Sequence, residues 1–204
     1  MSAPSPIVVF DVGNVLLRWD PHLLYAKLIP DAAKRDWFVR NVCTAAWNIE
    51  QDRGRSWEDA VATLVAQHPE WTDEIRASDA RWHETIPGTV EDNVAILEEL
   101  TDRGEAVYAI TNFSREKWAE CLIRFPFLQR FTGAVVSAHE RLIKPDPAIF
   151  ELLLSRYGLA AGRCIFVDDS LRNVEAARAA GMQAVHFVDG VDLRSALRAL
   201  GVNL

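Results

Sequence analysis

The 204-residue chain is long enough to bury a full hydrophobic core and to hold one domain with a substantial insertion. Half of its residues are hydrophobic and 25% are charged, a composition typical of soluble globular proteins. The formal net charge of -7 excludes general affinity for nucleic acid or for anionic membranes, because both require a basic surface.

The cysteines and the N-terminal residues predict the compartment. The three cysteines lie far apart and form no Cys-x-x-Cys pair, which is typical of reduced thiols in a reducing compartment. The first residues carry neither the basic segment nor the long apolar run of a signal or membrane anchor. We therefore expect a cytoplasmic protein.

The first expected strand covers residues 7–10. This run of four apolar, partly β-branched residues predicts a strand that is buried on both faces, as in a parallel sheet. Asp11 follows the run directly, and Gly13 indicates a turn. Asp11 therefore lies at the carboxyl end of the strand, where open α/β sheets bind their ligands. An Asp that only caps a turn is the structural alternative.

The stretch from residue 17 to residue 86 has helical signals and no strand pattern. Asp20-Pro21, Asp31 and Ser56 each predict the start of a helix, by side-chain capping or by proline in the first turn. Five of the seven tryptophans lie between residues 37 and 82, which indicates a compact region with its own core. We therefore expect residues 17–86 to form an inserted helical domain.

From Pro87 onward, expected strands alternate with amphipathic helices, a pattern typical of βαβ units and of a parallel sheet. Right-handed crossovers bring the carboxyl ends of such strands to one edge. The predicted fold is an α/β, doubly wound, Rossmann-like core formed by residues 1–16 and 87–204. The strands are expected at 106–110, 133–137, 164–167 and 184–188, and the helices at 90–103, 115–124, 147–157 and 173–180.

Polar residues follow the expected strands at this common edge. An acid, a hydroxyl, a lysine and an acid pair in one place predict a reaction centre. Each residue also has a structural alternative: Thr111-Asn112 can be the N-cap of the following helix, although Ser114 is the better cap candidate, the lysine can be solvated, and the second acid can cap a helix. The residues are Asp11, Thr111-Asn112, Lys144 and Asp168-Asp169.

This ordered set of motifs resembles the haloacid dehalogenase superfamily over essentially the whole chain. The resemblance implies the fold of that superfamily, with residues 17–86 as a small α-helical cap of the C1 type. The motifs are Phe-Asp-Val-Gly-Asn-Val at 10–15, Ile-Thr-Asn at 110–112, Ile-Lys-Pro-Asp-Pro at 143–147, and Val-Asp-Asp-Ser at 167–170 with Asn173 downstream.

The resemblance also implies a Mg²⁺-dependent hydrolase that forms a covalent aspartyl intermediate. Asp11 is then the nucleophile, Thr111 hydrogen-bonds the transferring group, and Lys144 neutralises charge. The implied metal ligands are Asp11, the Gly13 carbonyl group and Asp169, with Asp168 supporting the water shell of the ion. The implied substrate-binding residues are Asn14, Asn112 and Gly54; further candidates in the cap are Arg18, Trp19, Arg40, Trp47, Asn48, Arg53 and His83.

Two positions depart from the family pattern. Most phosphatases of the superfamily carry a second Asp, the acid and base of the reaction, where this chain has Gly13. Val15 replaces a residue that is commonly Thr. Because glycine transfers no proton, we expect a good leaving group, such as that of a sugar 1-phosphate, or a proton carrier from the cap or the substrate. Members with an Asp-x-Gly-Asn first motif resemble sugar-1-phosphate phosphatases.

The alternatives are a 2-haloacid dehalogenase and a non-catalytic protein that binds phosphate or regulates a partner. Halide leaves without a proton, which suits Gly13, but the Asp168-Asp169 pair would repel a carboxylate substrate and raise the pKa of the nucleophile. We expect a phosphatase of a small phosphorylated metabolite, without nucleic acid or membrane partners. A monomer and a homodimer are both compatible with the sequence.

Overall fold

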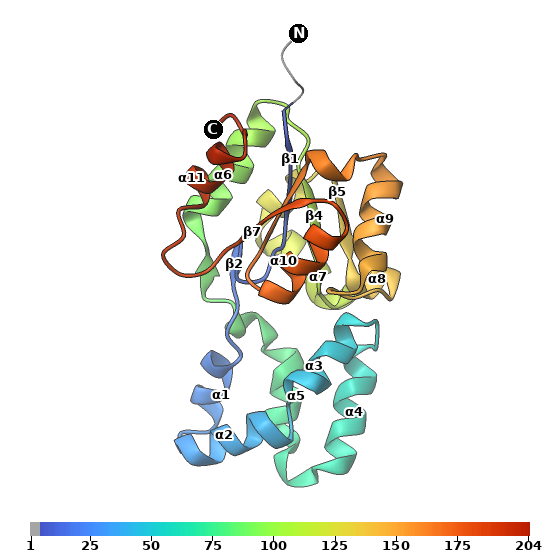
Figure 1. Cartoon of the computed structure of the whole chain (residues 1–204). Coiled ribbons are helices and arrows are strands. Elements are labelled where there is room, and N and C mark those ends of the chain that lie inside the picture. Colours follow the sequence, from blue (N-terminus) through green and yellow to red (C-terminus); the bar gives the residue numbers. More distant parts are fainter. Residues whose placement is uncertain (1–4) are drawn as a thin grey trace.

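The computed structural model describes residues 5–204, and a five-stranded sheet lies at its centre (Figure 1). The strand order is β5-β4-β1-β6-β7, and each neighbouring pair is parallel. This confirms the predicted α/β, doubly wound class, with β1 in the middle of the sheet. The strands are β1 (Ile7–Phe10), β4 (Tyr108–Thr111), β5 (Gly133–Val136), β6 (Cys164–Asp168) and β7 (Gln183–His186).

Helices cover both faces of the sheet, because alternate side chains of a strand point to opposite faces. Val8 and Phe10 of β1 pack in one cluster with Leu97, whereas Val9 packs in a second cluster with Phe150. The helices of this part are α6 (Glu91–Asp102), α7 (Arg115–Arg124), η3 (Pro126–Arg130), α8 (Ser137–Glu140), α9 (Pro147–Tyr157), η4 (Ala161–Arg163), α10 (Leu171–Ala179) and α11 (Leu193–Ala199).

A group of helices lies at one end of the sheet, below it in Figure 1. Its own cluster of buried side chains includes Leu24, Phe38, Trp71 and Ile75, and the Phe38 ring lies 4.8 Å from that of Trp71. The helices are α1 (His22–Leu28), α2 (Ala32–Asn41), α3 (Ala45–Asp52), α4 (Trp57–Gln67), η1 (Pro69–Trp71), α5 (Thr72–Ala80) and η2 (Trp82–Thr85).

The helical region is tied to the sheet at two places. The chain enters and leaves it through an antiparallel pair, β2 (Leu17–Arg18) and β3 (Gly88–Thr89). Helix α7 forms the second link: Trp57 Nε1 donates to Ser114 Oγ at 2.8 Å, and Lys117 pairs with Asp79 at 2.7 Å. These contacts hold α4 and α5 against the start of α7.

The predicted helix caps agree closely with the structure. Asp31, Ser56 and Ser114 each accept a hydrogen bond from a backbone N–H in the first turn of α2, α4 and α7. Helix α1 begins at His22, one residue later than Asp20-Pro21 predicts, although Asp20 still accepts from the His22 N–H at 2.8 Å. Of the helices within residues 5–204, none combines the length and apolar composition that crossing a bilayer would require.

Candidate active site

The carboxyl ends of the three central strands bring together residues from distant parts of the chain. Asp11 follows β1, Thr111 ends β4 and Asp168 ends β6. Because β1 pairs in register with both neighbours, these three side chains lie at one edge of the sheet. Lys144 reaches the same edge from the segment between α8 and α9.

Lys144 forms ion pairs with two buried carboxylates. Its Nζ atom lies 2.8 Å from Asp11 Oδ1 and 2.7 Å from Asp168 Oδ2, and its side chain is 1% exposed. Burial disfavours the charged lysine, but the charges of Asp11 and Asp168 outweigh that cost and raise the pKa of Lys144. The ammonium group is therefore charged at neutral pH.

Two side chains hold Lys144 and its partner in place. The Asn112 side chain accepts from the Lys144 N–H at 2.9 Å and donates to the Lys144 carbonyl group at 3.1 Å. Asp168 accepts from Asn173 Nδ2 and from the Ser170 N–H, both within 2.9 Å. Lys144 thus has a fixed backbone and a fixed counter-ion, which is the preorganisation that a catalytic charge needs.

An acidic cluster adjoins this lysine. Ligand atoms of Asp11, Asp168 and Asp169 all lie within 4.8 Å of one another. Burial raises the pKa of Asp11 to about 7, although Lys144 lowers it in part. Burial and the charge of Asp168 likewise raise the pKa of Asp169. Three carboxylates face one ammonium group here, so this all-oxygen donor set fits a divalent cation such as Mg²⁺.

Thr111 supplies a hydroxyl group without a partner. Its side chain is buried, and within residues 5–204 no hydrogen-bond partner is found for its Oγ1 atom. An unpaired buried hydroxyl costs about 1–3 kcal/mol. A ligand oxygen bound at the strand ends can remove that cost, which fits a phosphate oxygen.

The Gly13-Asn14 turn positions the loop beside the acids. Asn14 has a left-handed backbone with φ of 55°. Its side chain accepts from the Trp19 N–H at 2.9 Å and lowers the pKa of Asp169 by hydrogen bonding. The Asn14 side chain therefore connects the backbone at Trp19 with the acidic cluster. Gly13 lines the neighbouring cavity.

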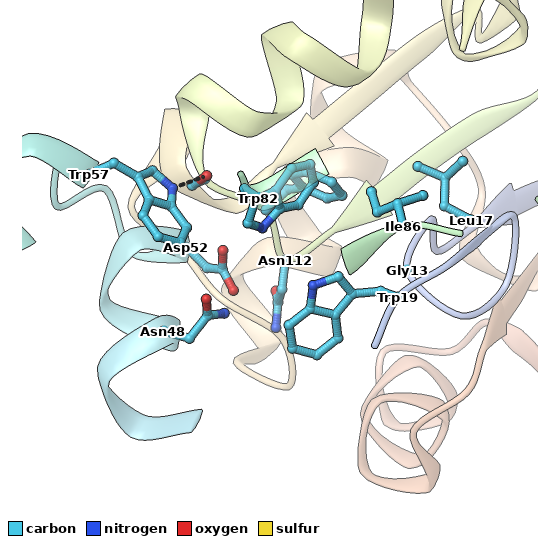
Figure 2. Close-up of a pocket in the computed structure, with 11 residues that line it drawn as sticks. Gly13, Leu17, Trp19, Asn48, Asp52, Trp57, Trp82, Ile86 and Asn112 are labelled. Atoms are coloured by element: carbon cyan, nitrogen blue, oxygen red, sulfur yellow. Dashed lines mark hydrogen bonds between the residues drawn. The ribbon is translucent and has the colours of Figure 1, made fainter. Parts of the chain in front are cut away.

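A cavity of about 100 Å³ lies between the sheet edge and the helical region (Figure 2). Gly13 and Asn112 belong to its sheet side, whereas Asn48 and Asp52 of α3 close it from the helical region. Most of the remaining lining is apolar and includes three indole rings, those of Trp19, Trp57 and Trp82; Leu17, Ile86, Phe113 and Ser114 complete it.

A second cavity, of about 300 Å³, lies within the helical region. It shares Trp19, Asn48, Trp57 and Trp82 with the first cavity, so the two cavities meet at this shared wall. Its other lining residues are mainly apolar and include Leu24, Tyr25, Val39 and Cys43.

Several candidates from the helical region lie elsewhere. Gly54 has φ of 106°, and a Cβ atom on it would lie 3.2 Å from the Ala138 carbonyl oxygen. It therefore contacts α8, and neither cavity counts it in its lining. Among the other candidates, Trp19 and Asn48 line the first cavity. Asp52, which belongs to the loop beside Gly54 that was expected to contact substrate, also lines it, although no role was predicted for Asp52 itself. The signal that reveals it is the i, i+4 spacing of Asn48 and Asp52, which places both on one helix face.

Comparisons with known proteins show the family of this chain. A model of haloacid dehalogenase-like hydrolases matches residues 6–181. The sesquiterpene phosphatase astK of Aspergillus oryzae is 29% identical over 195 residues, which cover 94% of this chain and 94% of that protein. The fructose-1-phosphate phosphatase YqaB of Escherichia coli is 36% identical over 83 residues, which cover 40% of this chain and 44% of that protein.

A solved structure shares the fold. A haloacid dehalogenase family enzyme from Bacteroides thetaiotaomicron, in complex with magnesium and inorganic phosphate, superimposes with a TM-score of 0.74 at 18% identity. The superposition covers 95% of this chain and 99% of that one. The sheet and the inserted helices therefore have a common arrangement in the two proteins.

Proposed function

This chain belongs to the haloacid dehalogenase-like hydrolases, and on that premise we propose that it is a Mg²⁺-dependent phosphatase of a small phosphorylated metabolite. The reaction passes through an aspartyl-phosphate at Asp11. The observation that supports it best is the pairing of Lys144 with Asp11 and Asp168, beside the unpartnered hydroxyl group of Thr111.

The chain's own residues would divide the chemistry as follows. A carboxylate oxygen of Asp11 attacks phosphorus, and the ester P–O bond breaks. Water then attacks the phosphorus of the aspartyl-phosphate, which releases inorganic phosphate and restores the Asp11 carboxylate. Lys144 offsets the negative charge that gathers at the site, and the Thr111 hydroxyl group donates to a phosphoryl oxygen.

The metal belongs to the acidic cluster. We propose that Asp11, Asp169 and the Gly13 carbonyl group hold Mg²⁺, with Asp168 bonded to the water shell of the ion. When bound, Mg²⁺ offsets the repulsion between a phosphate dianion and a carboxylate nucleophile. The Asp168 oxygens already accept hydrogen bonds from Lys144, Ser170 and Asn173. This agrees with a position of Asp168 outside the direct ligands of the ion.

Residues 17–86 act in this proposal as the cap domain, and residues 1–16 and 87–204 as the core. Asn48 and Asp52 face the sheet edge across the first cavity, with Asn112 on the opposite side. A cap that closes over this edge excludes bulk water from the phosphoryl group. Asn14 and Asn112 then support the substrate site from the core side.

The cavities favour one class of substrate. Three indole rings and several aliphatic side chains surround the first cavity, and the second extends this apolar lining. We propose a phosphate ester of an apolar alcohol, a class that also agrees with the name of the sesquiterpene phosphatase. Sugar phosphates are the competing class: Gly13 favours an anomeric sugar 1-phosphate, whereas the name of the fructose-1-phosphate phosphatase agrees with a sugar phosphate in general.

Dehalogenation is the less favoured reaction. It suits Gly13, since a halide leaves without a proton. However, ligand atoms of the buried acids Asp11 and Asp168 and of half-buried Asp169 lie within 4.8 Å of one another, and this cluster would repel the carboxylate of a 2-haloacid.

A direct comparison of products tests the proposal. Inorganic phosphate is measured with farnesyl phosphate and with glucose 1-phosphate, with Mg²⁺ or with EDTA, beside chloride release from 2-chloropropionate. We expect Mg²⁺-dependent phosphate release, faster from farnesyl phosphate, that Asp11→Asn abolishes. Chloride release that persists in EDTA would contradict the proposed reaction, whereas faster release from glucose 1-phosphate would contradict only the substrate class.

A further inference from the structure

The turn at Gly13-Asn14 carries no side chain that can transfer a proton, and the space beside Gly13 is open. A Cβ atom on Gly13 would meet no heavy atom within 4 Å apart from those of Gly13 and its two neighbours in the chain, so the cavity extends to the backbone at this position. Asn14, the next residue, is bonded to Trp19 and to Asp169. A group that protonates a leaving alcohol must therefore come from another element.

Asp52 occupies the opposite wall of that space. It is the last residue of α3 and lines the same cavity as Gly13 and Asn112. Figure 2 shows its carboxyl group directed into the cavity, on the side of Asn112. Within the described part of the chain, residues 5–204, neither a hydrogen bond nor an ion pair takes up this carboxyl group, so both oxygens are available to a ligand.

The electrostatic setting suits proton transfer. Burial raises the pKa of Asp52 to about 7, and the charge of Lys144 lowers it in part. Asp52 lines the same cavity as Asn112, whose side chain is hydrogen-bonded to the backbone of Lys144. A proton carrier works best when its pKa is near the working pH, because both protonation states are then populated.

We propose that Asp52 is the acid and base of the phosphatase reaction, supplied by the helical region in place of a side chain at position 13. In the first step the Asp52 O–H bond breaks and its proton passes to the alcohol oxygen as the ester P–O bond breaks. In the second step the Asp52 carboxylate takes a proton from the attacking water, whose oxygen bonds to phosphorus while the bond to Asp11 breaks. The cycle restores Asp11 as carboxylate and Asp52 as acid, and this inference rests on the proposed function.

The assignment widens the substrate class that Gly13 permits. An ordinary alcohol is a poor leaving group as an alkoxide, but it leaves readily as the neutral molecule. The substrate therefore need not be an activated ester such as a sugar 1-phosphate. Proton transfer also requires α3 to lie over the sheet edge, which couples the chemistry to the position of the helical region.

The test compares two esters in the Asp52→Asn variant. p-Nitrophenolate leaves without a proton, whereas the alkoxide of benzyl phosphate does not. We expect the rate constant of the initial burst of p-nitrophenol to change less than about threefold. The turnover rate of benzyl phosphate should fall about 100-fold or more. Glu50→Gln, which removes an exposed acid from the same helix, is the matched control and should match the wild type on both esters.

A second variant restores the missing proton from the core side. Gly13 has room for a side chain. The double variant Gly13→Asp, Asp52→Asn should therefore turn over benzyl phosphate at least about tenfold faster than Asp52→Asn alone. Equal losses on the two esters in Asp52→Asn, or a double variant no faster than Asp52→Asn, would overturn the assignment.

The wild-type enzyme gives an independent measurement that needs no folded variant. Its phosphate release should depend only weakly on the basicity of the leaving alcohol across a series of substituted esters; a steep dependence would overturn the role of Asp52. Failure of the proposed function is distinct, since the wild type would then release no phosphate from any ester with Mg²⁺.

Discussion

Lys144 shows how much one residue determines at this site. Its ammonium group bridges Asp11 and Asp168, so Lys144→Met leaves two buried carboxylates without their cation. We expect a loss of about 3–5 kcal/mol in the free energy of unfolding and at least about 100-fold in phosphate release. Lys27→Met is the control, because exposed Lys27 pairs with Glu84 and its loss should cost less than about 1 kcal/mol. Urea unfolding and turnover of both variants check this, and full activity of Lys144→Met would contradict it.

Substitution of Thr111 distinguishes a catalytic role of its hydroxyl group from a structural role. Because its Oγ1 atom has no partner in residues 5–204, Thr111→Val should leave the free energy of unfolding unchanged or raise it by up to about 1 kcal/mol. Phosphate release should still fall about 100-fold. Thr85→Val is matched to it: the Thr85 hydroxyl group donates to the Trp82 carbonyl group at 2.7 Å, so this change should lower stability. A Thr111→Val enzyme with wild-type turnover would rule out the proposed hydrogen bond.

Asp52 gives the protein a specific pH dependence. Burial raises its pKa from 3.8 to about 7, so between these values the folded protein holds a proton that the unfolded chain has lost. The contribution of Asp52 to the free energy of unfolding therefore falls as pH rises from about 4 to about 7. Asn does not ionise, so this loss is absent in Asp52→Asn. As pH rises from about 4 to about 8, the free energy of unfolding of Asp52→Asn should therefore rise by on the order of 2–4 kcal/mol relative to that of the wild type. Urea unfolding at both pH values checks this; a constant difference would contradict it.

Local patterns predict the residues at strand ends better than those on the cap. Asp11, Thr111 and Asp168 each follow or end a run of apolar residues, so parallel pairing alone brings them together. Asp52 lies on a helix whose position depends on packing between distant segments. Its sequence neighbourhood shows only the spacing from Asn48, which many surface helices share.

Among the elements, the end of α3 is held by a glycine that fits closely against the core. Gly54 has φ of 106°, and a Cβ atom there would lie 3.2 Å from the Ala138 carbonyl oxygen. Gly54→Ala should therefore lower stability by about 1–3 kcal/mol and reduce turnover, because it shifts α3 from the sheet edge. Gly104→Ala, at φ of 74° with open space around it, should lower stability only. Equal turnover of the two variants would show that α3 does not need this contact.

The elements that escaped prediction are short or paired over long distances. β2 and β3 have two residues each and pair across about seventy residues, so neither shows a periodic pattern. α8 has four residues and begins at Ser137, where the sequence predicted the last residue of a strand. α11 has seven residues and was not predicted either, although Asp192 caps it. Such elements depend on tertiary contacts more than on local propensity.

For the whole molecule, the order of strands and helices along the chain predicted a parallel sheet, whereas tertiary contacts determine where the helical region lies. Alternating strands and helices after Pro87 imply a parallel sheet, which the structure confirms. The placement of the helical region depends on contacts such as Trp57 with Ser114 and Asp79 with Lys117. These residues are far apart in the chain, and their sequence positions alone do not reveal the contacts.

In the proposed reaction Asp11 carries the phosphoryl group during turnover, and trapping of the phosphorylated enzyme would detect this intermediate. The enzyme is mixed with ³²P-labelled p-nitrophenyl phosphate, whose leaving group needs no proton, and with Mg²⁺; the mixture is then quenched in acid, digested and analysed by mass spectrometry. We predict a labelled peptide modified at Asp11, absent with EDTA and absent in Asp11→Asn, and more abundant in Asp52→Asn because the second step is slowed. Rapid phosphate release with no label at Asp11, or label that survives in Asp11→Asn, would contradict the account.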